Sequence, residues 1–180
     1  MHPYGTPTRR ASSRRAAALT VISVLILLSA CGGLTKHTAS PAGAGSTATA
    51  RFTARTVSGG SATLPGTRAS VLLFFSVECG GCGPTAQTLA QAQAQDPKTA
   101  DFAVVDVAGH ETAKDIQGFL EDHHASALAY ASDPDGTLVA RYGVTQLSTV
   151  VIVDPGGKVV FRAVEPNAAT IRAELNKVTG

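Results

Sequence analysis

The sequence has 180 residues, with 15 lysines and arginines against 13 aspartates and glutamates and a formal net charge of +2. Four of the basic residues (Arg9, Arg10, Arg14 and Arg15) stand in the first 18 positions, which hold no acidic residue, so that eleven basic and thirteen acidic residues remain in the rest of the chain. That balance, without a cluster of Lys and Arg interleaved with aromatic residues, argues against a nucleic-acid-binding protein, and three cysteines are too few for a disulfide framework.

Residues 1–30 have the pattern of an export signal. A basic, polar segment is followed by an apolar run of twelve residues over 19–30, which is too short to span a bilayer as a helix but has the length of a signal-peptide core. The run ends in the sequence Leu-Ser-Ala-Cys at 28–31, followed by glycine. This ending resembles the bacterial lipobox, whose cysteine receives lipid and becomes the new N-terminus. The resemblance predicts lipidation at Cys31; an ordinary secretory signal or a single-pass anchor are the alternatives.

Residues 31–50 consist mainly of Gly, Ala, Ser, Thr and Pro. A segment with so few large apolar side chains cannot bury enough surface to order itself, so it is predicted to be a disordered tether. Residues 51–180 are predicted to form one domain. The expected location is the extracytoplasmic face of the cell membrane, held there by the lipid anchor.

The domain alternates β-prone and helical segments. Strands are predicted at 52–57, 62–64, 71–75, 102–107, 127–131, 149–154 and 158–164. Helices are predicted at 84–95, at 111–124, at 135–142, and after a cap at Asn167 with Ile171, Leu175 and Val178 facing inward. Because residues 71–75 are all apolar, that strand is expected to be buried on both faces. The order of segments predicts an α/β fold with helices on both faces of a sheet.

The chemistry-bearing motif is Cys79-Gly80-Gly81-Cys82, which lies between a predicted strand and a predicted helix. The N-terminus of a helix carries partial positive charge and free N–H groups, which favour the thiolate form of a cysteine placed there. A second cysteine one turn further on can attack a mixed disulfide and release the product. The spacing therefore indicates dithiol redox chemistry.

The segment 71–82, the strand ending near Asp106, and Tyr142-Gly143-Val144 followed by 149–164 resemble the thioredoxin fold. The similarity is to the membrane-anchored TlpA/ResA-type thiol-disulfide proteins of bacteria, and it covers about residues 52–178. It implies a central mixed sheet with helices on both faces, Cys79 as the attacking thiol, Cys82 as the resolving thiol, and no cofactor. The implied partners are protein thiols and disulfides and a membrane or extracytoplasmic redox protein.

Three positions depart from the family pattern. Glu78 replaces the aromatic residue before the first cysteine, where its carboxylate opposes a thiolate, or relays protons if it points inward. Leu73 stands where thioredoxins place a buried acid, for which Glu78 is the nearest substitute. Ser148, after Leu147, replaces the cis-proline that packs against the cysteines. Because a cis bond before a residue other than proline costs about 3–4 kcal/mol, the Leu147–Ser148 bond is expected to be trans, which opens the site to metals.

Two other functions compete with thiol-disulfide exchange. A peroxiredoxin-like peroxidase is suggested by Ser76, three residues before Cys79, and a copper or other metal chaperone by the thioredoxin fold itself. A structural zinc site is not predicted, because zinc needs four ligands and the chain has no second Cys-x-x-Cys. The adjacent His123 and His124 would point about 100° apart on a helix and are expected to be solvated, and His110 is expected at the surface.

Overall fold

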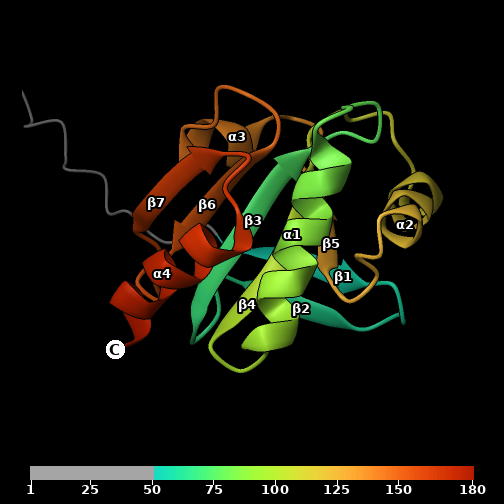
Figure 1. The fold of residues 1–180 in the computed structure, drawn as a ribbon. Helices are drawn as coiled ribbons and strands as arrows, with labels where there is room; N and C mark the ends of the chain where they lie inside the picture. Colours follow the sequence, from blue (N-terminus) through green and yellow to red (C-terminus); the bar gives the residue numbers. More distant parts are fainter. Residues whose placement is uncertain (1–50) are drawn as a thin grey trace, which may run out of the picture. The chain divides into compact units, whose positions relative to one another are not determined.

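A seven-stranded mixed sheet runs through residues 51–180, the part of the chain that the computed structural model describes (Figure 1). The predicted signal peptide, Cys31 and the tether lie outside these residues. The strand order is β2-β1-β5-β4-β3-β6-β7. The strands are β1 (Phe52–Thr56), β2 (Ser61–Leu64), β3 (Ala69–Phe75), β4 (Ala100–Asp106), β5 (Ala129–Ser132), β6 (Thr149–Val153) and β7 (Val159–Val164).

Strand β3 lies inside the sheet and leads to the cysteine motif. It pairs in parallel with β4, Phe75 lying opposite Asp106, and antiparallel with β6, Phe74 lying opposite Thr149. All seven residues of β3 are buried, because neighbouring strands flank it and both faces are covered. The expectation of a strand buried on both faces is therefore confirmed.

Within residues 51–180, four helices cover the two faces of the sheet. They are α1 (Cys82–Gln95), α2 (Ala113–Asp122), α3 (Thr137–Tyr142) and α4 (Ala168–Thr179). Leu73 and Phe75 belong to a core cluster with side chains of α1, α2 and α4, whereas Leu72 and Phe74 face the opposite cluster, which includes Tyr142 of α3. In Figure 1, α1 and α4 accordingly lie on the same side of the sheet. The predicted fold class, an α/β mixed sheet with helices on both faces, is confirmed.

Local sequence signals explain several of the boundaries. The Asn167 side chain accepts a hydrogen bond from the N–H of Thr170, so the predicted cap of the last helix is confirmed. At the start of α2, Thr112 and Asp115 form a capping box. In the predicted hairpin turn, the Asp154 carboxylate accepts the N–H of Lys158.

Other boundaries differ from the sequence-based ones. Helix α1 begins at Cys82 rather than at residue 84, so the second cysteine is itself helical. Helices α2 and α3 each begin two residues later than predicted, because Thr112 caps the first and Gly136, in the left-handed region with φ 69°, precedes the second. None of the helices in residues 51–180 is both long and apolar enough to cross a membrane.

Candidate redox site

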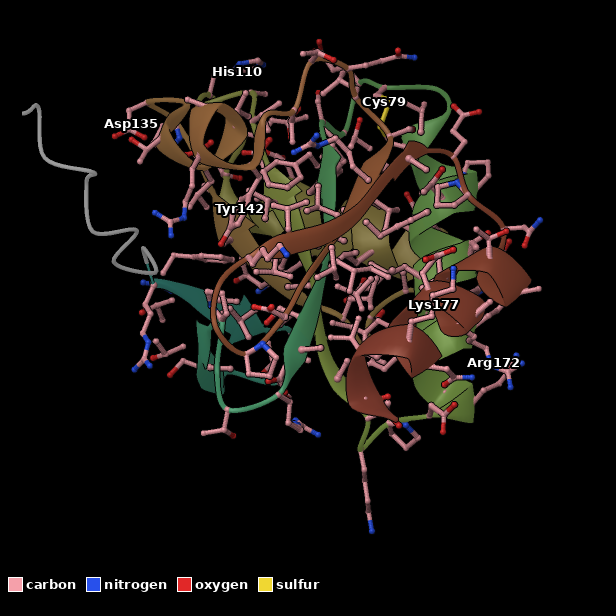
Figure 2. The ribbon with its side chains drawn as sticks, turned by 90° about the vertical axis from the view of Figure 1, so that its left-hand side faces the viewer. Cys79, His110, Asp135, Tyr142, Arg172 and Lys177 are labelled. Carbon is pink, nitrogen blue, oxygen red and sulfur yellow. A yellow bond between two sulfur atoms is a disulfide. The ribbon has the colours of Figure 1, made fainter. Side chains whose placement is uncertain are left out.

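A disulfide joins Cys79 to Cys82 at the end of the sheet where β3 ends (Figure 2). The two Cα atoms are 5.4 Å apart. The N–H of Cys79 donates to the carbonyl of Ser76 at 3.1 Å, and the N–H of Cys82 donates to the carbonyl of Cys79 at 3.0 Å. These two turns bring the chain from the buried end of β3 directly into the first turn of α1.

The two cysteines differ in exposure. Cys79 is half-buried, whereas Cys82 has no accessible surface and belongs to the core beneath α1. The N-cap residue of α1 is Gly81, which supplies no side chain to accept the free N–H groups of the first turn. The prediction that Cys79 is the more exposed of the two is confirmed, and its greater ionisation stays a prediction.

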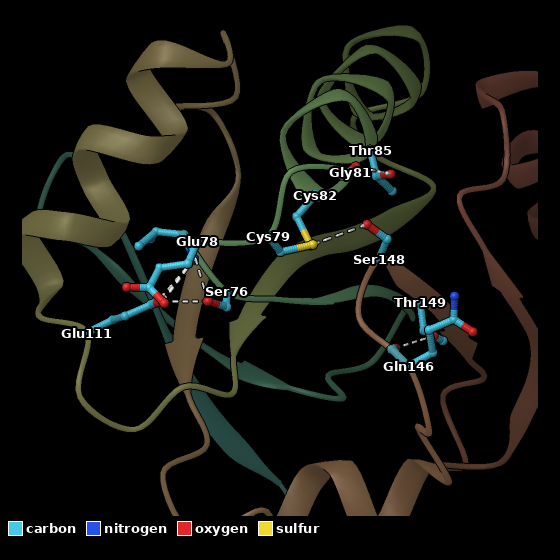
Figure 3. The surroundings of a disulfide bond; sticks show 11 residues. Ser76, Glu78, Cys79, Gly81, Cys82, Thr85, Glu111, Gln146, Ser148 and Thr149 are labelled. Atoms are coloured by element: carbon cyan, nitrogen blue, oxygen red, sulfur yellow. Dashed lines mark hydrogen bonds between the residues drawn. A yellow bond between two sulfur atoms is a disulfide. The ribbon is translucent and has the colours of Figure 1, made fainter.

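Ser148 faces the disulfide (Figure 3). Its Oγ lies 3.2 Å from Sγ of Cys82 and 3.8 Å from Sγ of Cys79, and the residue is only 2 % exposed. The hydroxyl therefore lies beside the cysteines, where the family has its proline, and Cys82 is its nearer partner. The single cis peptide bond of residues 51–180 is Leu64–Pro65, so the Leu147–Ser148 bond is trans, as expected. Leu147 is half-buried and packs against the core cluster that contains Cys82.

A second acid, which the sequence did not single out, adjoins the same turn. The N–H of Glu165 donates to the carbonyl of Ser148 at 3.0 Å, and both residues have positive φ, 48° and 59°. The Glu165 carboxylate occupies the space that a Cβ at Gly81 would need. No local sequence signal marks Glu165, because the β6–β7 pairing brings it to the site.

Glu78 does not point into the protein. Its side chain is exposed, and its backbone N–H donates to Oγ of Ser76 at 3.2 Å. Exposure argues against the inward proton relay that the sequence left open, and solvent screens the opposition of the Glu78 carboxylate to a thiolate. Leu73 is fully buried, as its place in β3 requires.

The buried acid near the site is Asp106 instead, at the end of β4. It has no accessible surface, and burial raises its pKa to about 6, with the neighbouring Glu111 carboxyl group acting in the same direction. Glu111 in turn accepts the hydroxyl of Ser76 at 2.6 Å and the N–H of Val77 at 3.0 Å (Figure 3). A signal for Asp106 existed in the sequence, namely a lone acid ending an apolar strand beside the strand that leads to the cysteines. Nothing local marks Glu111.

The histidines are placed differently from one another. His110 is exposed, as expected. His123 is only half-exposed, which corrects the expectation that it is solvated. Its ring packs against Phe119, tilted by 59° with 4.7 Å between the centroids, and covers Gly83 in the first turn of α1. Gly83 makes this contact possible because it has no Cβ. The Ser76 hydroxyl, on which the peroxidase alternative depends, donates to Glu111.

The sheet order and the Cys-x-x-Cys pair that follows β3 are those of the thioredoxin fold. A family model described as thioredoxin-like matches residues 67–159, and the chain belongs to that family. A protein of Streptomyces lividans named "Mercury resistance operon ORF3" is 41% identical over 117 residues. The match covers 63% of this chain and 62% of that protein, so the chain spans less than two thirds of the relative's length.

Solved structures of low sequence identity share the fold. StoA from Bacillus subtilis superimposes with a TM-score of 0.59 at 16% identity, covering 70% of this chain and 96% of StoA. A secreted Mycobacterium tuberculosis disulfide oxidoreductase gives 0.56 at 21% identity over 70% of this chain and 95% of that chain. The exposed lipoprotein thioredoxin of Streptococcus pneumoniae superimposes with a TM-score of 0.57 at 23% identity, covering 71% of this chain and 99% of that chain.

Proposed function

We propose that this protein exchanges disulfides with exported proteins through Cys79 and Cys82 at the outer face of the cell membrane. The observation that carries the proposal is the Cys79–Cys82 disulfide at the N-terminus of α1, with Cys79 half-exposed and Cys82 buried. A half-exposed cysteine can meet a protein substrate, whereas the buried one can reach only the sulfur beside it. This asymmetry is what a division into attacking and resolving thiols requires.

The exchange proceeds in two displacements. The Cys79 thiolate attacks a sulfur of the substrate disulfide, so that a Cys79–substrate bond forms while the substrate S–S bond breaks and one substrate thiolate leaves. The Cys82 thiolate then attacks the Cys79 sulfur, forms the intramolecular disulfide and releases the second substrate thiolate. Two electrons and two protons pass from the cysteine pair to the substrate, and the reverse sequence oxidises a substrate dithiol.

The proposed location rests on the sequence ahead of the domain. The apolar run and the Leu-Ser-Ala-Cys ending at 28–31 support export and lipidation at Cys31, with residues 31–50 as the tether. One structural neighbour, from Streptococcus pneumoniae, is described as an exposed lipoprotein thioredoxin, and another, from Mycobacterium tuberculosis, as secreted. Exported proteins with disulfides are the substrates that such a location offers.

Equilibration with glutathione tests the proposed exchange. The domain is incubated in buffers of graded reduced-to-oxidised ratio, and its free thiols are alkylated and counted by mass. We expect one reversible two-electron transition of the Cys79–Cys82 pair, within the roughly −270 to −120 mV that this fold spans. A disulfide that never equilibrates with glutathione would contradict exchange and indicate a purely structural bond.

A second candidate function is binding of a soft metal ion by the reduced pair. Ser148 lies beside both sulfurs on a trans peptide bond, and the relative from Streptomyces lividans is named for a mercury resistance operon. A mercuric ion would replace the protons of the two thiols, since thiolates are the ligands that soft ions prefer.

Metal titration of two reduced proteins tests this candidate. Hg(II), Cu(I) and Zn(II) are added to the wild type and to Ser148→Pro. Proline fixes φ at about −65°, whereas φ of Ser148 is 59°, so Ser148→Pro has to change the backbone of this loop. We expect weaker binding by Ser148→Pro, because the rebuilt loop loses the hydroxyl and the open backbone beside the sulfurs. Equal affinity in the two proteins would contradict a role for Ser148 in metal access.

A further inference from the structure

The carboxyl group of Asp106 is buried and only half satisfied. Its Oδ1 accepts the N–H of Ala108 at 3.0 Å, whereas its Oδ2 has no accessible surface and no donor among the described residues. A buried carboxylate oxygen without a donor is costly. Such an oxygen is satisfied if it carries a proton and donates it to a neighbouring acceptor.

Glu111 is the neighbouring carboxyl group, and both hydrogen bonding with it and its negative charge raise the pKa of Asp106. Two carboxyl groups form a hydrogen bond only when one of them is protonated. A single proton held between Asp106 and Glu111 therefore satisfies the buried oxygen and avoids two adjacent negative charges.

Glu111 also holds the segment that carries the attacking cysteine. It accepts the hydroxyl of Ser76 and the N–H of Val77, while Ser76 accepts the N–H of Glu78 at its hydroxyl and the N–H of Cys79 at its carbonyl. Every residue from 76 to 79 is thus bound to Glu111 directly or through Ser76 (Figure 3).

We propose that Asp106 and Glu111 form a proton-sharing carboxyl pair that positions residues 76–79 for disulfide exchange. The inference rests on the proposed function and names Asp106 and Glu111 as positioning residues, since neither touches a sulfur in a described contact. When the shared proton leaves, the two carboxylates repel each other. Glu111, the more exposed of the two, then turns toward solvent and releases Ser76 and Val77.

Other charged groups around the pair modify this balance. His110, on the same loop, favours ionisation of Asp106 when it is protonated. From the end of β3, Glu78 is exposed, and from α2, Lys114 and Asp115 are exposed as well. Such exposed groups are screened by solvent.

Directly after β5, the neighbouring acid is Asp133. Its carboxylate accepts the N–H groups of Leu138 and Val139 at the start of α3, at 2.9 and 2.8 Å, while its own N–H donates to the carbonyl of Asp106. The side chain of Asp133 is therefore committed to α3.

The test compares the rate of exchange per thiolate across pH. The reduced domain reacts with hydroxyethyl disulfide between about pH 4 and pH 8, and each rate is divided by the fraction of Cys79 thiolate, obtained from the ultraviolet absorbance of the thiolate. In the wild type we expect this corrected rate to fall about threefold to tenfold as the pH rises through the region of about 6.

Three variants separate the effect of the shared proton from the effect of the hydrogen bonds that Glu111 accepts from Ser76 and Val77. Glu111→Ala should give the low corrected rate at every pH, because residues 76–79 lose their acceptor. Asp106→Asn and Glu111→Gln should give the high rate at every pH, because an amide N–H replaces the shared proton. Asp101→Asn, the same change at the opposite end of β4, is the matched control and should follow the wild type.

Two results would overturn the proposal: a Glu111→Ala protein as fast as the wild type at every pH, or an Asp106→Asn protein with the wild-type fall. If one of these two variants does not fold, Glu111→Gln decides, since a wild-type pH dependence in it excludes a shared proton. Alkylation of Cys79 alone reads the position of residues 76–79 without a disulfide substrate. A wild type that alkylates normally but never exchanges would therefore contradict the proposed function and not the carboxyl pair.

Discussion

Ser148 places a hydroxyl within 3.2 Å of one sulfur and 3.8 Å of the other. In the reduced protein this hydroxyl can donate to a thiolate, and a hydrogen bond to a charged group contributes about 1.5–3 kcal/mol. Ser148→Ala should therefore slow alkylation of the reduced pair at neutral pH by about tenfold. Iodoacetamide kinetics on the reduced proteins measure the effect.

Ser70→Ala is the matched control for that change, because Ser70 is also a buried serine, located in β3, and its hydroxyl has no described partner. We expect its alkylation kinetics to equal those of the wild type. Equal kinetics in Ser148→Ala as well would mean that the Ser148 hydroxyl does not stabilise a thiolate.

Asp106 makes stability depend on pH. Burial raises its pKa in the folded protein to about 6 from the ordinary aspartate value of 3.8, so the folded state holds the proton more tightly than the unfolded chain. The stability that this proton contributes is fully present below the unfolded-state pKa of 3.8 and is lost as the pH rises through the folded-state pKa of about 6. Between these limits the free energy of unfolding should fall by at most about 3 kcal/mol.

Asp106→Asn should remove that part of the pH dependence, because an amide does not titrate. Urea unfolding of the wild type, Asp106→Asn and Asp101→Asn at several pH values measures it, with Asp101→Asn expected to follow the wild type. If the free energy of unfolding changes between pH 4 and pH 7 by the same amount in all three proteins, Asp106 does not titrate as described.

At the scale of elements, the first turn of α1 depends on the absence of a side chain at Gly83. The His123 ring occupies the space that a Cβ there would need, so Gly83→Ala should destabilise the domain by about 1–2 kcal/mol, an overpacking cost reduced by the better helix propensity of alanine. In the His123→Ala background the same change should become neutral or stabilising. Urea unfolding of the four proteins measures the coupling.

Gly118→Ala is the control for that pair, because Gly118 lies in α2 and a Cβ there would meet nothing within 4 Å. It should stabilise the domain by up to about 1 kcal/mol. If Gly83→Ala behaves like Gly118→Ala, the ring of His123 does not pack on α1 as described.

Elements with a strong local signal could be predicted from the sequence. The unbroken apolar run of β3 and the Asn167 cap of α4 are fixed by neighbouring residues and were found within two residues of their observed places. Of the site residues, only those that lie close together in the sequence, such as Cys79 and Cys82, could be predicted. Glu111 and Glu165 reach the site through loop and strand pairings far from the motif in sequence, and the contact of His123 with Gly83 depends on how α2 packs on α1.

At the scale of the whole molecule, the proposed anchor separates the roles of the three cysteines. If Cys31 carries lipid, Cys79 and Cys82 form a self-sufficient pair, as their disulfide requires. The full-length protein should partition with membranes and incorporate labelled fatty acid, and Cys31→Ala should abolish both. Fatty acid that fails to enter the wild type would exclude the lipobox interpretation.

The central claim is the division of labour between the half-exposed Cys79 and the buried Cys82. Trapping of mixed disulfides tests it most directly, because a resolving thiol that has been removed cannot release the substrate. Cys82→Ala, incubated with an exported protein that contains a disulfide, should accumulate a covalent adduct through Cys79, and Cys79→Ala should accumulate none. Equal trapping by the two variants, or trapping by Cys79→Ala alone, would contradict the account.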